Sequence, residues 1–397
     1  EWQQLEQGLT QRARLLNQIT ADLYGPKTLL NVGGLPPALV FGNPRFLLPM
    51  YNYRTTGDEF LNLIAFDVGR SPDGQWRVVA DWTEAPEGLG MCLENRVLAG
   101  QALPELFQQL RTQRLAAFYR AFARHLTQHA AEITSEGITV IMSPGPEHPN
   151  YFEHAYLAQE MGCELVEGRD LFVDKDDYVY MHTVSGAQRV DVIYRRIDDD
   201  FMDPEAFRPE SRLGVPGLLR AWQAGNVSLA NAPGAGVADD KVVYAFVPDF
   251  IRFYLGEEPL IPNVPTYRCM FEDEREYVLA NLDKLVVKPA NESGGYGILM
   301  GKSASSSERR QFTKLIRANP RNYIAQPTLN LSTVPTVIGR KVEPRHVDLR
   351  PFILSGRSNQ VTTGGLTRVA LRKGSLVVNS SQGGGSKDTW IVDSEES

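Results

Sequence analysis

Apolar side chains recur at the spacing of an α-helix in several parts of the chain. A leucine-rich stripe predicts an amphipathic helix over residues 1–24. A second stripe predicts one long helix over about 106–132, and shorter helical patterns cover 151–161 and 272–282. These stretches alternate with shorter apolar runs, so helices and strands are interleaved along the chain.

The shorter apolar runs predict strands in two different settings. Phe60–Val68 and Trp76–Trp82 flank Asp73-Gly74, which is typical of a tight hairpin. In the middle of the chain, strands alternate with helices, which predicts a parallel sheet with crossover helices. The fold class is therefore α/β. Further strands are expected at residues 138–142, 164–167, 178–182, 189–194, 285–288, 323–326, 347–354, 361–363 and 376–379.

The pattern divides the chain into three regions, 1–105, 106–260 and 261–397. Arg195 and Arg196 directly follow the predicted strand 189–194 of the middle region, at its carboxyl end, where open α/β sheets bind ligands. We expect both arginines to contact substrate.

In the same region, Ser143-Pro144-Gly145-Pro146 precedes a helix that contains Glu153 and His154. This segment is either ordinary helix-start chemistry or a contact for an anionic substrate at a helix N-terminus.

Composition narrows the class of protein. The chain has 397 residues, 42% of them hydrophobic, and a net charge of −7, which disfavours a nucleic acid or an anionic membrane as partner. No run reaches the roughly 18 apolar residues of a membrane span, and residues 1–24 lack the apolar centre of a signal peptide. Cys92, Cys163 and Cys269 show no CxxC spacing, which excludes a cysteine metal site and suits the cytoplasm.

The most informative motif is a strand that delivers Lys288 into the loop Asn291–Gly297. Glycines let backbone N–H groups close around phosphate oxygens, and a lysine adds a charge to the same anion. A surface hairpin with turn glycines is the alternative. A P-loop is rejected because Tyr296 stands where that motif needs its first glycine.

Polar residues with complementary chemistry follow in order. Gln326 ends a strand, Arg350 follows Asp348 in another, and Arg368 and Asn379 precede a second glycine-rich loop. Two arginines and an amide suit a phosphate group and a developing oxyanion. Each arginine by itself could equally be a solvated or ion-paired side chain.

This order of motifs, VVKP-x-x-x-SGGYG, YIAQ, DLRPF, an arginine and an asparagine, resembles the ATP-grasp superfamily. Glutathione synthetase and the glutamate ligases of ribosomal proteins show the most similar pattern. The resemblance implies that Lys288 and the loop hold the ATP phosphates and that Gln326 contacts adenine. It implies catalytic roles for Arg350, Arg368 and Asn379 at the transferred phosphate and acyl group. The loop residues concerned are Ser293, Gly294, Gly295, Tyr296 and Gly297.

The magnesium-binding segment of that superfamily should follow, but here its counterpart lies near the front. Asp67, a hairpin turn and Asp81 occupy the corresponding places. Over nearly its whole length the chain resembles the circularly permuted ATP-grasp (type 2) family, whose members resemble glutathionylspermidine synthases. The resemblance implies Mg²⁺ on Asp67 and Asp81, and a permuted ATP-grasp unit with a Rossmann-like pre-ATP-grasp domain between its halves. The stretch Lys387-Asp388-Thr389-Trp390 also fits, and Lys387 is expected to contact substrate.

Two positions depart from the superfamily pattern. Thr83 stands where an asparagine ligand is expected, so Glu84, Glu94 or Asn95 would have to complete the metal shell. The second phosphate-binding lysine has no clear match, and Arg268 is the nearest candidate.

The expected activity is ATP- and Mg²⁺-dependent joining of a small-molecule acid to an amine through an acyl phosphate. Two alternatives stay open: an ATP-binding but catalytically silent scaffold, and phosphoryl transfer to an acceptor that is not a carboxylate. His125 and His129 have the i, i+4 spacing of zinc ligands, but no third ligand accompanies them, so they are interpreted as structural. The substrates and the oligomeric state cannot be deduced.

Overall fold

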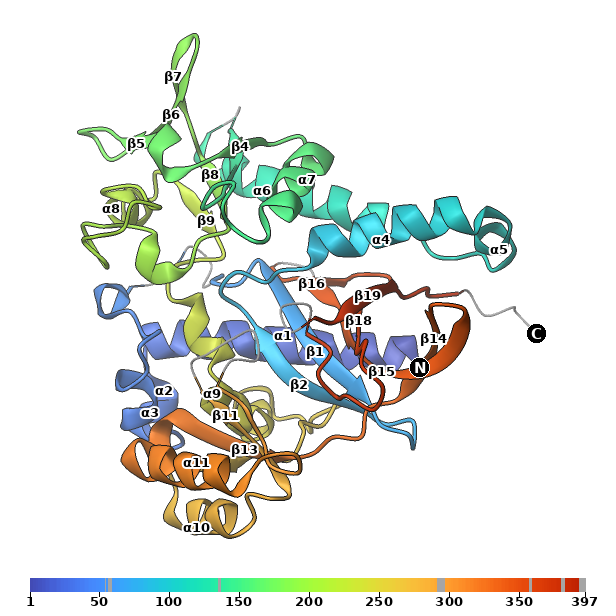
Figure 1. Ribbon diagram of the computed structural model, residues 1–397. Coiled ribbons are helices and arrows are strands. Elements are labelled where there is room, and N and C mark those ends of the chain that lie inside the picture. The colour runs from blue at the N-terminus through green and yellow to red at the C-terminus, as the bar shows by residue number, and fades with distance from the viewer. Residues whose placement is uncertain are drawn as a thin grey trace.

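The computed structural model describes residues 1–53, 55, 59–134, 137–290, 297–356, 359–379 and 383–392. Across these ranges the chain forms four β-sheets with helices packed around them (Figure 1). One sheet is parallel, so the α/β class with a parallel sheet is confirmed. Within the same ranges, no helix combines the length and apolar character that a bilayer crossing requires.

The largest sheet joins the two ends of the sequence. Strand β1 (Leu63–Arg70) pairs antiparallel with β15 (Lys341–Arg350) and β16 (Phe352–Leu354), which follow one another along one of its edges, and with β2 (Trp76–Trp82) along the other edge. A strand from the first hundred residues is therefore central to a sheet that is otherwise built mostly after residue 330. The remaining strands are β14 (Thr333–Ile338), β17 (Gln360–Val361), β18 (Leu366–Val369) and β19 (Gly385–Asp388).

Alternation along β1 gives this sheet two different faces. Phe66 and Val68 pack in the same core as Leu9 of helix α1 (Trp2–Tyr24), which lies along the sheet in Figure 1. Ala65 points the other way, into a second core, and Asp67 shares that second face because side chains alternate along a strand. The predicted N-terminal helix and the predicted hairpin β1–β2 are both present, with Gly74 in the left-handed region (φ 88°) at the turn.

A smaller antiparallel sheet lies beside the large one, with strand order β10-β13-β11-β12. It carries Lys288 in β11, and Gln326 sits opposite Val286 on β13. Helix α9 (Lys241–Phe250) leads toward it from the middle of the chain. The other elements are β10 (Tyr267–Arg268), β11 (Leu285–Pro289), β12 (Leu299–Met300), β13 (Tyr323–Pro327), α10 (Glu272–Ala280) and α11 (Ser306–Ala318).

The parallel sheet has the order β4-β3-β8-β9, and α6 and α7 contact its strands. Asn231 directly after β9 connects this sheet to the large one. Its side-chain oxygen accepts from the N–H groups of Asn62 (2.6 Å) and Leu63 (2.9 Å), and its amide nitrogen donates to the carbonyls of Leu63 (2.7 Å) and Thr83 (2.6 Å). The elements are β3 (Thr139–Met142), β4 (Glu164–Val166), β8 (Val192–Arg195), β9 (Ser228–Ala230), α6 (Ala116–Ile133) and α7 (Tyr151–Met161).

A three-stranded antiparallel sheet and several short helices complete the described chain. The three-stranded sheet lies beside the parallel sheet, and two of the short helices lie near the C-terminal end of α1 (Figure 1). Their bounds are β5 (Leu171–Val173), β6 (Val179–Thr183), β7 (Gly186–Arg189), α2 (Thr28–Asn31), α3 (Pro37–Phe41), α4 (Leu89–Ala102), α5 (Pro104–Gln109) and α8 (Leu218–Gln223).

Several predicted elements were wrong in extent or type, and the strand expected over 189–194 is the last residue of β7 followed, after two residues, by β8. The single helix over 106–132 is two helices, because the chain between α5 and α6 turns to pair with residue 392. The single strand over 347–354 is interrupted at Pro351, which has no N–H to donate to a sheet. Residues 376–379 form a loop instead of a strand.

Candidate functional site

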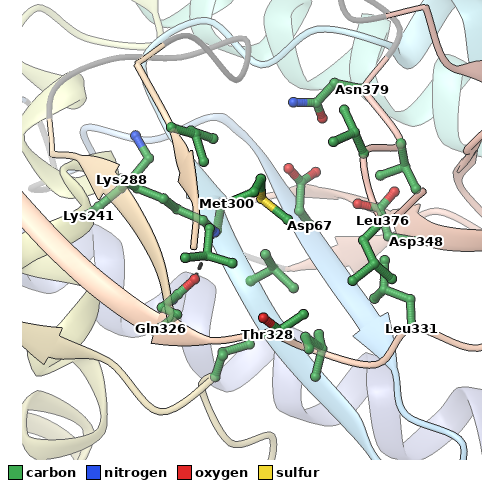
Figure 2. A pocket seen from close by; sticks show the side chains of 18 of the residues that line it. Asp67, Lys241, Lys288, Met300, Gln326, Thr328, Leu331, Asp348, Leu376 and Asn379 are labelled. Atoms are coloured by element: carbon green, nitrogen blue, oxygen red, sulfur yellow. Dashed lines mark hydrogen bonds between the residues drawn. The ribbon is translucent and has the colours of Figure 1, made fainter. Parts of the chain in front are cut away.

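A cavity of about 380 Å³ lies between the large sheet and the small sheet. Figure 2 shows Lys288, Lys241 and Gln326 on one side of it, and Asp67, Asp348 and Asn379 on the other. Its size is within the range of small-molecule sites in proteins, about 300–1,000 Å³. Its apolar lining comes mainly from Val264, Val286, Ile298, Met300, Pro327, Leu329, Leu331, Leu376, Val377 and Val378.

Lys288 and Gln326 face the cavity from adjacent strands of the small sheet. The ammonium group donates to the Gln326 side-chain oxygen at 2.7 Å, and the Gln326 amide donates to the Thr266 hydroxyl at 3.0 Å. Burial, together with the nearby charge of Lys241, lowers the pKa of Lys288 to about 8. A half-buried lysine that has no carboxylate at hydrogen-bond distance among the described residues is well suited to an anionic ligand.

Asp67 projects from β1 into the same cavity and accepts bonds from three side chains. Arg350 donates to both carboxylate oxygens, at 2.7 and 3.1 Å, and Arg368 lies 2.9 Å from one of them. The Trp82 indole donates at 2.9 Å. Burial raises the pKa of Asp67, but the charges of Arg350 and Arg368 outweigh burial and hold that pKa below its usual range.

Arg368 and Asp348 face each other across β18 and β15, where they are register partners. The guanidinium binds both oxygens of Asp348, with a distance of 2.8 Å for the Nε contact. Burial raises the pKa of Asp348, and the positive charge of Arg368 opposes this effect. Asn379 lines the cavity from the loop that was predicted as a strand, and its carbonyl accepts from Gly384.

Lys241, at the first position of α9, also lines the cavity and was missed from the sequence. The residue proposed in its place, Arg268, does not line the cavity and binds Glu274 instead. Asp240 accepts from the N–H groups of Val242 and Val243, so it caps the helix that starts with Lys241. That Asp–Lys pair before an apolar helical run is the signal that could have identified Lys241.

The structure does not bring Asp81 to this cavity. Both of its carboxylate oxygens bind Arg12 of α1, at 2.6 and 2.7 Å. The register explains the difference, because Asp81 is paired with Phe66, whose side chain faces α1. Ala80 and Trp82, its neighbours in β2, line the cavity instead. The expectation that Asp81 shares a metal ion with Asp67 therefore does not fit the geometry.

The other positions weighed for the metal shell also lie elsewhere. The buried Thr83 hydroxyl donates to the Ala235 carbonyl at 2.7 Å. Glu84 is ion-paired with Arg45. His125 binds the side chain of Asn62 at 2.8 Å, and no group of three potential metal-ligating side chains occurs among the described residues.

The three residues expected to contact substrate have separate environments. Arg195 is fully buried, binds the carbonyls of Asn231 and Ile197, and is ion-paired with Asp199 at 2.8 Å, so it cannot bind a ligand without breaking these contacts. Arg196 is buried next to it. Lys387 lines a different cavity on the α1 side of the large sheet and donates to the Pro335 carbonyl at 3.1 Å. The expectation of a substrate contact at Arg195 or Lys387 therefore does not fit either.

The predicted phosphate-binding loop is only partly visible in the structure. Ser293, Gly294, Gly295 and Tyr296 lie outside the described residues. Gly297 is exposed, with φ at +66°. Ile298 directly after it lines the cavity, so the described end of the loop opens onto the cavity.

The residues of the cavity fit ATP and a magnesium ion. The apolar lining suits a purine ring, and Lys288, Lys241 and Arg368 give cationic charge for phosphates. Mg²⁺ is usually bound by one or two carboxylates together with substrate phosphates. Among the described contacts, one oxygen of Asp67 accepts only from Arg350, so it retains a lone pair for a cation. The side chains of Asp348 and Asn379 are the nearest further oxygen donors in the lining.

Comparisons with known proteins show the family and the fold of the chain. The circularly permuted ATP-grasp type 2 family matches residues 1–370. An uncharacterized protein of Synechocystis sp. is 53% identical over 393 residues, which cover 99% of this chain and 82% of that protein. A protein of Frankia alni named "Putative glutamate--cysteine ligase 2-3" is 42% identical over 394 residues, which cover 98% of this chain and 45% of that protein.

A solved structure shows the same fold at low sequence identity. The apo form of a glutathione-synthetase-like effector from Globodera pallida superposes with a TM-score of 0.60 and 12% identity, covering 98% of this chain and 87% of that one. The family match and the Synechocystis relative extend over most of the sequence. The chain belongs to the circularly permuted ATP-grasp type 2 family and is, through that membership, an ATP-dependent ligase.

Proposed function

We propose that this chain joins a carboxylic acid to an amine through an acyl phosphate, using Mg-ATP in the cavity between the two sheets. The observation that carries the proposal is that Asp67, Lys288 and Arg368, which lie far apart in sequence, line one cavity. Anion-binding lysine, carboxylate and arginine are the groups that phosphoryl transfer to a carboxylate requires. The free cysteines are consistent with a cytoplasmic location.

In this proposal the substrate carboxylate attacks the γ-phosphorus of ATP, and the bond to the bridging oxygen breaks to release ADP. The amine nitrogen then attacks the acyl carbon, phosphate leaves, and the nitrogen loses a proton to solvent. Lys288 holds the phosphates, with Lys241 next to it, and Gln326 contacts the adenine. Mg²⁺, held by Asp67 with Asp348 in place of Asp81, would neutralise phosphate charge.

Arg350, Arg368 and Asn379 would bind the transferred phosphoryl group and the oxyanion of the tetrahedral intermediate. Asp67 is ion-paired with both arginines and so holds them in place, and of the two Arg368 lines the cavity. Fixed donors of this kind stabilise developing negative charge without reorganisation.

The test is to incubate the protein with Mg-ATP and panels of acids and amines, measuring ADP by a coupled assay and new amides by mass spectrometry. ADP formed together with an amide is expected. Lys288→Met should abolish ADP formation and weaken ATP binding, whereas Lys302→Met, which removes an exposed lysine near the small sheet, should change neither.

The alternatives have distinct outcomes. ATP binding without ADP in any panel would indicate a silent partner. The cavity face of β2, which presents Ala80 and Trp82 and no carboxylate, is the observation that favours this alternative. ADP with a stable phosphorylated product and no amide would indicate transfer to an acceptor other than a carboxylate.

A further inference from the structure

Arg196 differs from the other arginines that are buried in the described chain, because it has no carboxylate partner. Its Nη1 donates to the Tyr194 hydroxyl at 3.0 Å and its Nη2 to the Ala85 carbonyl at 3.4 Å, while Nε has no partner. Burying a guanidinium group without a partner costs free energy of folding unless an anion binds it. The others are ion-paired: Arg12 with Asp81, Arg96 with Asp388, Arg195 with Asp199, Arg345 with Glu343 and Arg368 with Asp348.

His154 presents a second polar atom without a partner, its Nε2. The ring is fully buried, and burial together with the charge of Arg196 lowers the pKa of His154 to about 2, so the ring is neutral. Its Nδ1 lies 2.9 Å from the Ser143 hydroxyl, which accepts from the Gly145 N–H at 3.2 Å. Since Nδ1 is the acceptor available to the Ser143 hydrogen, the ring proton resides on Nε2, which is therefore a donor.

These two unpaired donors follow neighbouring strands of the parallel sheet, Arg196 directly after β8 and His154 in α7, the helix that follows β3. Strands β3 and β8 are neighbours, and the Arg196 N–H donates to the Met142 carbonyl at 2.8 Å. Ser143, which holds His154, directly follows Met142. His148 of the connecting loop stacks on His154 with ring centroids 5.3 Å apart, and its neighbour Glu147 is exposed to solvent. One loop thus separates the donors from solvent.

The acidic side chains described in this region form no ion pair with Arg196. Glu153 directs its carboxylate to the N–H of Gly88, at 2.8 and 2.9 Å, and to that of Gly90 at 3.3 Å. Glu87 acts on Arg196 only through its charge. Arg196 Nε–H and His154 Nε2–H therefore have no acceptor, and no ion pair neutralises the charge of Arg196 in the described structure. The missing partner is an acceptor with negative charge.

The loop after β2 sets the distance from these donors to the reacting groups. Arg196 binds the carbonyl of Ala85, and Arg350 binds the carbonyl of Glu87 at 3.0 Å. Two residues of extended chain span at most about 7 Å. The guanidinium groups of Arg196 and Arg350 therefore bind neighbouring carbonyls of one short loop, and a small molecule can contact both.

We propose that Arg196 Nε–H and His154 Nε2–H bind the second, non-reacting carboxylate of the acid substrate. The substrate class is a short dicarboxylic acid or acidic amino acid, for which glutarate and L-glutamate are representative probes. The inference rests on the proposed ligase function in one respect, namely that the other carboxylate of the substrate is the one that ATP phosphorylates. Arg196 is then a specificity residue, since an acid without the second carboxylate leaves both donors unpaired.

Calorimetry with three probes, glutarate, L-glutamate and the monocarboxylate butyrate, tests the proposal in the presence of Mg-ADP. The wild-type protein should bind glutarate or L-glutamate at least tenfold more tightly than butyrate. Arg196→Met should weaken binding of the dicarboxylate about 10- to 100-fold, the worth of a hydrogen bond to a charged group. Arg212→Met, which removes an exposed arginine, is the matched control and should leave it unchanged.

Equal binding of the dicarboxylates and butyrate by the wild-type protein would overturn the proposal without any variant. Dicarboxylate binding that survives Arg196→Met would also overturn it and would leave a buried water as the partner of the two donors. Unchanged Mg-ADP affinity shows that each variant is folded. ADP release from Mg-ATP, measured separately, tests the ligase function, so either idea can fail while the other stands.

Discussion

Lys288 is a cavity cation whose pKa lies close to neutral pH, so its charge changes over an accessible pH range. Burial and Lys241 place its pKa at about 8, and the phosphates of a nucleotide would raise that value by favouring the charged form. Nucleotide binding above pH 8 should therefore take up protons, and affinity should fall as pH rises through 8. Calorimetry in two buffers of different ionisation enthalpy measures this uptake. Lys288→Met should show none, and uptake that persists in this variant would assign the titration to another group.

Arg350→Ala should reduce turnover far more than nucleotide affinity. The guanidinium is held by Asp67 and the Glu87 carbonyl, and in the proposed mechanism its remaining donors bind the reacting group. Loss of one such donor typically lowers kcat by a factor of about 10² to 10³. Steady-state rates and nucleotide titrations give the two quantities. A variant with a normal rate and weak nucleotide binding would reverse the assignment.

Asp81→Asn should affect stability and leave the magnesium dependence unchanged. Its carboxylate is buried against Arg12, and breaking a buried pair by removing one partner costs about 3–5 kcal/mol of unfolding free energy. Asp67→Asn, the comparison, should instead shift the magnesium concentration needed for ADP formation. Denaturant melts and magnesium titrations separate the two effects, and a magnesium shift in Asp81→Asn would restore Asp81 to the metal site.

Residue types in order were enough to predict which side chains line the cavity, but the face of a strand was harder to predict. Lys288, Gln326 and Asn379 line the cavity as the motifs suggested. Asp81 and Lys387 do not line the cavity. Asp81 is the register partner of Phe66 and Lys387 that of Thr367, and both of these partners face away from the cavity. The bulge between Asp67 and Val68 shifts the alternation in the hairpin, and no residue in the sequence announces it.

At the scale of elements, the joint between the parallel sheet and the large sheet depends on one side chain. The amide of Asn231, 2% exposed, satisfies four backbone groups at the ends of β1 and β2. Strands with clear alternation were predictable, whereas this joint is not, because it is a long-range contact of one loop asparagine. Lys241 was missed for the same reason, since its place depends on where α9 packs.

Asn231→Asp should destabilise the protein more than most surface substitutions. A carboxylate keeps the acceptor for Asn62 and Leu63 but loses both donors, so the carbonyls of Leu63 and Thr83 would face a negative charge. Each unsatisfied buried group costs about 1–3 kcal/mol. Denaturant unfolding at neutral pH is the measurement, and a loss below about 1 kcal/mol would mean that solvent reaches the joint. Asn330→Asp, at an exposed asparagine, is the control.

At the scale of the whole molecule, the front of the chain and its last hundred residues form one sheet. The amides of β1 should therefore exchange hydrogen as slowly as those of β15 and β16, because all three open together. Exchange followed by mass spectrometry on peptides from these strands is the measurement. Fast exchange of β1 beside slow exchange of β15 would mean that the strands are separate cooperative units.

The central position of β1 has a consequence during protein synthesis. When the ribosome has made residue 82, β1 can pair with β2, and its partners in β15 and β16 are still more than 250 residues away. At a synthesis rate of about 5–20 residues per second, the apolar face of β1 remains without these partner strands for roughly 15 to 60 s. During that time the nascent chain must shield Phe66 and Val68 by other means, with α1, already translated, as the nearest cover.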